Sequence, residues 1–273
     1  MCYSWLVLID QTRYKAFWSN PEYFRLRYLK DLDAKIEGAP NKYGRDRGTV
    51  FHILNEGAED AEAQIKEAVQ SPAAITMART MHTAYKQATN PKFKTLAKEV
   101  AFMVSIGDGR NGMAGRIDSI IETASGLVWC GETKTAGTRA DLAAIKWEWQ
   151  RNPQADFEII GARSLGYDVE GVLVHIIKEA VPAPRVWQIE VKRTPEQLAT
   201  LERNVYMTCE IIQMLITQFG IDKPWPHVIP GFNPCVKTGY CDFEQDCSSC
   251  NIDSSKYTKR KEHLEGMEQW SAA

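Results

Sequence analysis

The chain has 273 residues, of which 44% are hydrophobic and 25% charged, and its 33 basic and 35 acidic side chains give a net charge of −2. This length can bury a large core, and no stretch of about eighteen apolar residues predicts a membrane span. The sequence does not start with a basic segment followed by an apolar one, so we expect a cytoplasmic protein. The balanced charge excludes a general polycationic surface for gripping phosphates, so nucleic-acid binding would depend on local basic clusters.

Hydrophobic periodicity predicts helices first, then strands and helices in alternation. The order favours an α/β fold with a central mixed β-sheet flanked by helices. We expect one domain over residues 1–253, with a helical part (1–98), a sheet core (99–193) and a C-terminal helix with cysteines (194–253), before a polar tail (254–273). The expected helices cover residues 5–30, 49–69, 73–88, 141–165 and 194–219, and the expected strands cover 100–106, 113–123, 127–133, 171–177 and 185–191.

Two of the expected strands form a hairpin, because only the small-residue break Ala124-Ser-Gly126 separates them. Glu132 and Lys134 are two residues apart, so they point to the same face of the sheet. With the hairpin centred on Ser125, position 118 lies opposite position 132, and directly opposed Cβ atoms are about 5 Å apart. Asp118 and Glu132 could therefore share one divalent cation.

Carboxylates at this spacing suit a hard cation such as Mg²⁺ or Mn²⁺, which binds oxygen ligands and leaves room for water and a substrate phosphate. Such an ion would polarise a phosphodiester and make a bound water more acidic. Lys134 could orient or deprotonate that water, or neutralise charge that develops on the phosphate. The alternative is a surface salt-bridge cluster of Asp118, Glu132 and Lys134 on an exposed sheet face.

The pattern of Asp118 followed by Glu132-Thr-Lys134 resembles that of the PD-(D/E)xK nucleases. The upstream segment Gly48-Thr-Val-Phe-His52 resembles the Gly-x-x-x-His helix of their RecB-like branch, which includes the AddB nuclease domain and the CRISPR-adaptation exonucleases. The resemblance implies a restriction-endonuclease-like core. It also implies that His52, Asp118, Glu132 and the main-chain carbonyl of Thr133 bind the catalytic metal ion. Taken alone, His52 would be an ordinary core or surface histidine.

Two further residues are candidates for supporting roles at this site. The family has a Gln-x-x-x-Tyr motif on the helix after the Glu-x-Lys strand, where it contacts substrate and active site. Gln154 matches its first position, but the fourth residue on is Glu158 and the nearby aromatic is Phe157. Glu99 precedes a strand at a place where the family often carries a glutamate, so it is either a second ligand or water-positioning group, or a solvated strand-end carboxylate.

Four of the seven cysteines lie within sixteen residues near the C-terminus, which favours a thiolate metal site in a reducing compartment. Many RecB-like nucleases hold a [4Fe–4S] cluster with such cysteines and one upstream Cys-Pro, but this chain has Asn20 before Pro21. Three interpretations stay open: a cluster completed by Cys250 or Cys2, a zinc ion in its place, or free thiols. Cys130 and Cys209 lie in apolar patterns and are expected to be buried. The four clustered cysteines are Cys235, Cys241, Cys247 and Cys250.

The resemblance implies a metal-dependent deoxyribonuclease, acting as an exonuclease on DNA ends or single strands in recombination or repair in a phage or bacterium. The sequence does not separate it from a structure-specific endonuclease on the same fold. A catalytically degenerate DNA-binding protein with a cysteine metal site is the non-enzymatic alternative. No protein partner can be read from the sequence.

Overall fold

The computed structural model describes residues 7–30, 32–34, 42–89, 92–180, 182–225 and 257–259. Contacts divide the chain into two compact units made of non-consecutive segments. The first unit comprises residues 1–37, 105–113 and 200–273, and the second comprises 38–104 and 114–199. The predicted cysteine site and nearly all of the polar tail lie outside the described residues, and the expected domain boundaries stay a prediction.

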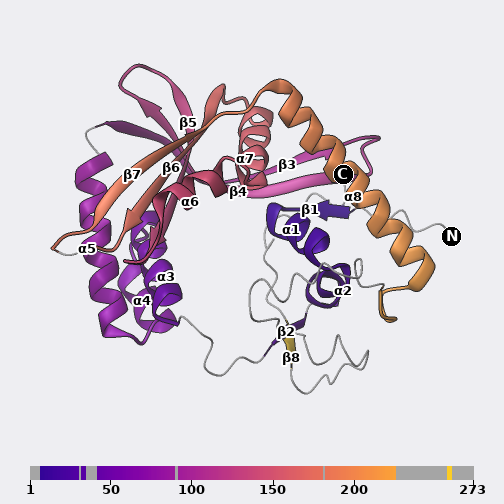
Figure 1. The fold of residues 1–273 in the computed structure, drawn as a ribbon, viewed down its shortest axis with the longest axis horizontal. Coiled ribbons are helices and arrows are strands. Elements are labelled where there is room, and N and C mark those ends of the chain that lie inside the picture. The colour runs from indigo at the N-terminus through magenta and orange to yellow at the C-terminus, as the bar shows by residue number, and fades with distance from the viewer. Residues whose placement is uncertain are drawn as a thin grey trace. The chain divides into compact units, whose positions relative to one another are not determined.

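The fold is built on a six-stranded mixed sheet with the order β1-β4-β5-β6-β7, in which β3 also pairs with β4 (Figure 1). The β4–β5 and β6–β7 pairs are antiparallel, whereas β5–β6 is parallel. The predicted α/β core with a mixed sheet flanked by helices is therefore confirmed. The strands are β1 (Val7–Ile9), β3 (Phe93–Ile106), β4 (Asn111–Thr123), β5 (Val128–Ala136), β6 (Val169–Lys178) and β7 (Arg185–Val191). A separate small sheet pairs β2 (Leu32–Ala34) with β8 (Tyr257–Lys259).

Helices cover both faces of the sheet in the second unit. One face packs on α3, α4 and α5, whose apolar side chains form a cluster with Ile177 of β6. The other face packs on α7. The Cys130 thiol on this face donates to the Glu158 carbonyl of α7 at 3.6 Å. Cys130 pairs with Val172 of β6, and residues 172 and 177 of that strand point to opposite faces, so α7 lies on the face opposite Ile177. The helices are α3 (Lys42–Glu56), α4 (Ala61–Ala68), α5 (Pro72–Thr89), α6 (Leu142–Trp149) and α7 (Pro153–Ser164).

The first unit contains α1 (Gln11–Ser19), α2 (Pro21–Phe24), a π-helical turn η1 (Arg25–Leu29) and most of α8 (Pro195–Phe219). The predicted apolar stripe of α8 is buried, including Cys209, and Cys130 in the second unit is also buried, as expected. The stripe consists of Leu198, Leu201, Val205, Cys209, Ile212 and Leu215.

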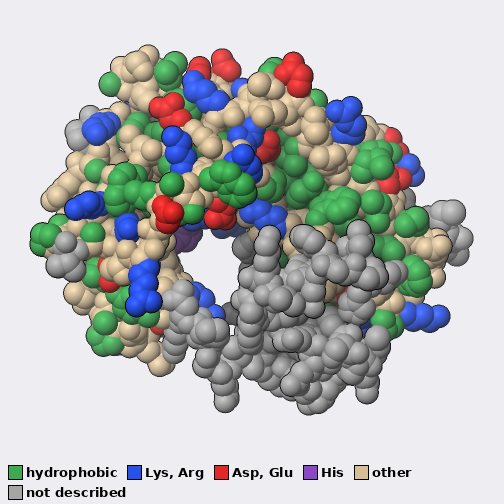
Figure 2. All heavy atoms as spheres, viewed as in Figure 1, with side chains coloured by type: hydrophobic (Ala, Val, Ile, Leu, Met, Phe, Trp, Pro, Cys, Tyr) green, Lys and Arg blue, Asp and Glu red, His purple; other side chains and the backbone are tan. Residues whose placement is uncertain are grey.

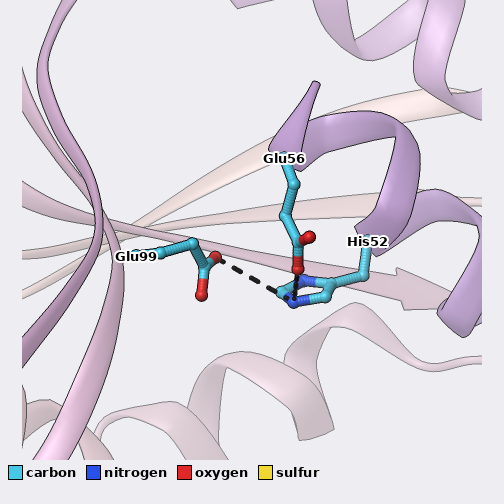
Figure 3. Close-up of side chains that lie close together, drawn as sticks. All are labelled: His52, Glu56 and Glu99. Carbon is cyan, nitrogen blue, oxygen red and sulfur yellow. Dashed lines mark ion pairs between the residues drawn. The ribbon is translucent and has the colours of Figure 1, made fainter. Parts of the chain in front are cut away.

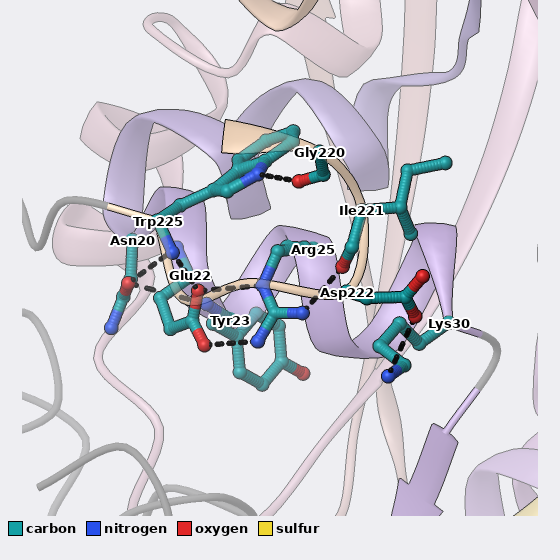
Figure 4. A network of polar contacts seen from close by, with 9 residues as sticks. All are labelled: Asn20, Glu22, Tyr23, Arg25, Lys30, Gly220, Ile221, Asp222 and Trp225. Carbon is teal, nitrogen blue, oxygen red and sulfur yellow. Dashed lines mark hydrogen bonds and ion pairs between the residues drawn. The ribbon is translucent and has the colours of Figure 1, made fainter. Parts of the chain in front are cut away.

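A buried polar network ties α2 to the residues after α8 (Figure 4). The Arg25 guanidinium donates to Glu22 Oε2 at 2.8 Å and to the Ile221 carbonyl at 2.6 Å. Glu22 Oε2 also accepts from the Trp225 main-chain N–H at 2.7 Å. Asn20 caps α2, because its side-chain oxygen accepts from the Glu22 N–H at 2.9 Å. Asn20 thus has a structural role at the position where the resemblance implies a cysteine.

Several expected boundaries are wrong. The strand expected at 100–106 begins at Phe93, so Glu99 lies within β3 rather than before it. The helices expected at 49–69 and 141–165 are each two helices, α3 with α4 and α6 with α7. Residues 7–9 belong to strand β1, which pairs in parallel with residues 111–113 of β4, and a helix begins only after Asp10. The Asp10 carboxylate caps that helix by accepting from the Arg13 N–H at 2.7 Å. Helix α3 begins at Lys42 rather than near Thr49, so Gly48 is in its interior. Tertiary packing overrides the weak helix propensity of glycine there.

The charged surface agrees with the sequence balance. On the face shown in Figure 2, Lys and Arg side chains are interspersed with Asp and Glu side chains. None of the described helices is both long enough and apolar enough to pass through a membrane.

Candidate active site

The β4–β5 hairpin brings the two predicted carboxyls together. Ser119 pairs with Gly131 and Ile120 with Cys130, so continuing the register by one residue sets Asp118 opposite Glu132. This is the register that a hairpin centred on Ser125 predicts. The two carboxyls are close enough that the charge of Asp118 raises the pKa of Glu132.

Glu132 is almost fully buried, with 1% of its surface exposed. Burial raises the pKa of Glu132 above its ordinary value, and the charge of Asp118 raises it further. Lys134 Nζ forms an ion pair with Glu132 Oε1, while 49% of the Lys134 side chain stays exposed. Burial lowers the pKa of Lys134, but the Glu132 carboxylate outweighs this effect and the pKa is raised. Lys134 is therefore an ammonium group at neutral pH, suited to stabilise negative charge at the solvent boundary.

Glu158 is a third carboxyl of this cluster, and it extends the predicted set. It comes from α7, one turn after Gln154, whose Nε2 donates to Glu158 Oε1 at 2.7 Å. Its other oxygen, Oε2, has no hydrogen-bond partner among the described residues. Burial raises the pKa of Glu158 well above its usual range, and the charges of Glu132 and Asp118 raise it further. The sequence signal was present in the four-residue spacing from Gln154, which places both side chains on one face of a helix.

His52 lies in an adjoining group with two glutamates (Figure 3). Its Nε2 is 2.7 Å from Glu56 Oε1 and 4.0 Å from Glu99 Oε1. One ligand atom from each of the three residues lies within 4.8 Å of the others, a spacing that could hold a metal ion. Glu56 was not predicted, although its position one turn after His52 on α3 could have identified it.

Glu99 connects the two groups. Burial raises its pKa, and the charge of Asp118 is the next largest cause. The Glu99 backbone has a φ of 48°, in the left-handed region that costs a non-glycine residue about 1–2 kcal/mol. Strained residues of this kind cluster at functional sites. On the preceding residue, Lys98 Nζ donates to the carbonyls of Asn55 at 2.8 Å and Glu56 at 3.2 Å, at the end of α3.

The donor set fits a divalent cation. Hard cations bind carboxylate oxygens, and the cluster supplies Asp118 and Glu132 as a cross-strand pair, together with Glu158, whose Oε2 has no hydrogen-bond partner among the described residues. Thr133, whose carbonyl the resemblance adds as a ligand, lies between Glu132 and Lys134 in β5 and pairs with His175 of β6. The ligands implied for one cation thus fall into two adjoining groups, one around Asp118 and one around His52.

No family model matches the chain, and no curated protein does. Among solved structures, the chain is similar to a candidate exonuclease from Eubacterium rectale, with a TM-score of 0.54 and 14% identity. That match covers 99% of this chain and 94% of the other. The protein named SSO0001 aligns over 91% of this chain and 97% of its own, at 17% identity, but the TM-score of 0.38 is too low to show a shared fold. The chain therefore shares the fold of the candidate exonuclease, and at this identity the likeness concerns the fold alone.

Proposed function

We propose that this protein is a metal-dependent deoxyribonuclease that hydrolyses phosphodiester bonds as an exonuclease on DNA ends or single strands. The observation that carries the proposal is the β4–β5 register, which sets Asp118 opposite Glu132, with the Lys134 ammonium paired to Glu132. The fold shared with a candidate exonuclease supports it. So does the motif order from His52 to Lys134 along the chain.

In this proposal Asp118, Glu132 and the Thr133 carbonyl bind Mg²⁺ or Mn²⁺, and His52 binds a cation on the side of Glu99. A bound cation would polarise the phosphodiester and lower the pKa of the attacking water. Lys134 neutralises charge that develops on the phosphate oxygens as the water attacks, because its pKa is raised and it keeps its proton.

Gln154 acts in this proposal as a positioning residue. Its hydrogen bond to Glu158 Oε1 fixes that carboxyl and leaves Oε2 beside Glu132 and Asp118. Glu99 holds its carboxylate between His52 and Arg116, whose Nη1 is 3.6 Å away. A role in recombination or repair, a cytoplasmic location, and iron–sulfur or zinc binding by Cys235, Cys241, Cys247 and Cys250 stay predictions of the sequence resemblance.

The test is cleavage of linear and circular DNA, single- and double-stranded, with Mn²⁺ or Mg²⁺, by the wild type and Lys134→Ala. Lys192→Ala is the matched control, because Lys192 also pairs with a carboxylate, Glu170 at 3.1 Å, on an exposed surface. We expect cleavage of linear substrates that is lost by about 10²-fold or more in Lys134→Ala and kept in the control.

Cleavage of circular DNA would show that the protein is a structure-specific endonuclease rather than an exonuclease. The degenerate alternative is favoured by one observation, the carboxyl of Glu158 at the position of the family's tyrosine. If wild-type protein bound DNA but cleaved no substrate with either metal, the catalytic proposal would be abandoned for that alternative.

A further inference from the structure

A cavity of about 220 Å³ lies beside the carboxyl cluster in the second unit. Asp118 and Glu99 form part of its wall, so it adjoins the proposed site of phosphodiester cleavage. Its apolar surface comes from Tyr85 of α5, Phe93 of β3 and Ile121 of β4. The proposed chemistry gives this space no role, because neither Glu132 nor Lys134 belongs to its lining.

His175 contributes a buried polar surface to this cavity. The residue is 1% exposed, and Tyr85 and Phe93 contact its ring edge-to-face, with centroids 5.4 and 5.5 Å away. Its Nε2 lies 3.1 Å from Gln188 Nε2, but Nδ1 has no hydrogen-bond partner among the described residues. Burial lowers the pKa of His175 to about 4, so the imidazole is neutral and can offer a donor or an acceptor. A buried polar atom without a partner costs free energy unless a ligand or water satisfies it.

The charges around the cavity favour a neutral occupant. Lys86 and Lys98 line it together with Glu56, Glu99 and Asp118, so cationic and anionic groups nearly balance. A free phosphate would meet three carboxyls here, whereas a flat heteroaromatic ring would meet two aromatic side chains and an imidazole. Nucleobases bind proteins in this way, by stacking on aromatic side chains with hydrogen bonds at the ring edge.

We propose that this cavity binds the nucleobase of a nucleotide at the cleavage site, with its phosphate at the cation that the Asp118 cluster would hold. This inference rests on the proposed nuclease function and specifies how that site positions its substrate. The rings of Tyr85 and Phe93 contact the base, and His175 pairs with its polar edge. The pocket is a positioning device: it fixes which phosphodiester stands next to the metal ligands.

The test measures binding separately from cleavage. A short fluorescent single-stranded oligonucleotide is given one abasic residue at each position in turn, and its affinity for the protein is measured by anisotropy in EDTA. We expect one position at which the abasic residue weakens binding by about tenfold. With Mn²⁺, the same substitution is expected to slow cleavage or move the cut by one nucleotide.

Variants connect that position with the cavity. Tyr85→Leu and Phe93→Leu keep apolar volume but remove the aromatic rings, and His175→Gln keeps a polar edge. We expect each variant to reduce the difference in affinity between the unmodified and the abasic oligonucleotide. The unmodified base has fewer contacts to lose in these variants. Trp147→Ala is the matched control, because Trp147 is an exposed aromatic of α6 outside the cavity lining.

The outcomes separate the two proposals. Cleavage with no abasic residue changing affinity by more than twofold would overturn the base pocket and leave the nuclease standing. A positional penalty that Tyr85→Leu, Phe93→Leu and His175→Gln leave unchanged would also overturn the pocket. Absence of both cleavage and DNA binding would overturn the proposed function and, with it, the pocket.

Discussion

Gln154 Nε2 donates to Glu158 Oε1 at 2.7 Å, within one turn of α7. The hydrogen bond holds a carboxyl where the Gln-x-x-x-Tyr pattern has a phenol. Because Glu158 is 3% exposed and its other oxygen is unpaired among the described residues, the site carries one more buried acid than the sequence motif requires. This acid has consequences that can be measured without knowing the substrate.

Glu158→Gln is expected to stabilise the metal-free protein at pH 8. The pKa values of Glu132 and Glu158 are raised by burial, so the folded protein binds protons more tightly than the unfolded chain. The contribution of these groups to the free energy of unfolding is therefore fully present below their unfolded pKa values. It is lost as the pH rises through their folded pKa values. Glutamine keeps the hydrogen bond to Gln154 without the charge, and the gain should be about 1–3 kcal/mol at pH 8.

Urea unfolding in EDTA at pH 5 and pH 8 measures this effect. The gain should be smaller at pH 5, because the raised pKa values favour the uncharged carboxyls in the folded protein as the pH falls. Glu170→Gln serves as control, because this exposed residue should show no such pH dependence. An equal effect of Glu158→Gln at both pH values would contradict the electrostatic account.

Glu99→Gly is expected to be more stable than Glu99→Ala by about 1 kcal/mol, because glycine adopts the observed φ of 48° without steric cost. Both variants remove the carboxylate that lies 4.0 Å from His52, so both should lose cleavage to the same extent. Denaturant unfolding and cleavage rates of the pair separate backbone strain from chemistry. Equal stabilities would show that the strand relaxes at this position.

Arg25→Met is expected to destabilise the protein by about 3–5 kcal/mol, because it leaves the buried Glu22 carboxylate without its partner. Adding Glu22→Gln should recover part of the loss, since glutamine still accepts from the Trp225 N–H. Lys30→Met is the control: its pair with Asp222 is largely exposed and should cost less than about 1 kcal/mol. Urea unfolding of the wild type and these three variants measures the losses, and equal losses in Arg25→Met and Lys30→Met would refute the prediction.

Gly161→Ala is expected to cost about 1–3 kcal/mol by overpacking. A Cβ at position 161 would lie 2.4 Å from the Phe102 ring, and one at Gly115 would lie 2.7 Å from the same ring. Phe102→Leu should restore part of the stability of Gly161→Ala, whereas Gly137→Ala should be neutral, because nothing lies within 4 Å of its Cβ. Thermal unfolding of the single and double variants tests the coupling. If the losses of stability in Gly161→Ala and Phe102→Leu simply added in the double variant, a steric conflict between the two side chains would be refuted.

Local patterns predicted the pairing of Asp118 with Glu132, and the family resemblance added His52, Glu99 and Gln154. The acidic residues Glu56 and Glu158 were missed. Period-two alternation and a small-residue turn are local signals, and they were enough to place Asp118 opposite Glu132. Glu56 meets Glu99 only because α3 packs beside β3, and no local pattern records that distance. The cavity around His175 likewise depends on five separate elements, α3, α5, β3, β4 and β6.

The early helix start shows the same limit in the fold. Gly44 and Gly48 weaken local helix propensity, so the sequence predicts a start near Thr49, but packing extends α3 back to Lys42. A Cβ on Gly48 would lie 3.5 Å from Thr135 Oγ1, which is ordinary contact, so the glycine is not needed there for space. The error came from using propensity where tertiary contacts decide: Asp46 and Arg47 in the added segment are buried, and Arg47 forms an ion pair with Glu179.

The two carbonyls that Lys98 contacts at the end of α3 belong to Asn55 and Glu56, and its own chain neighbour is Glu99. One ammonium group thus joins the helix that carries His52 to the strand that carries the facing carboxylate. The two hydrogen bonds thus help to fix the end of α3 against β3, and with it the distance between His52 and Glu99.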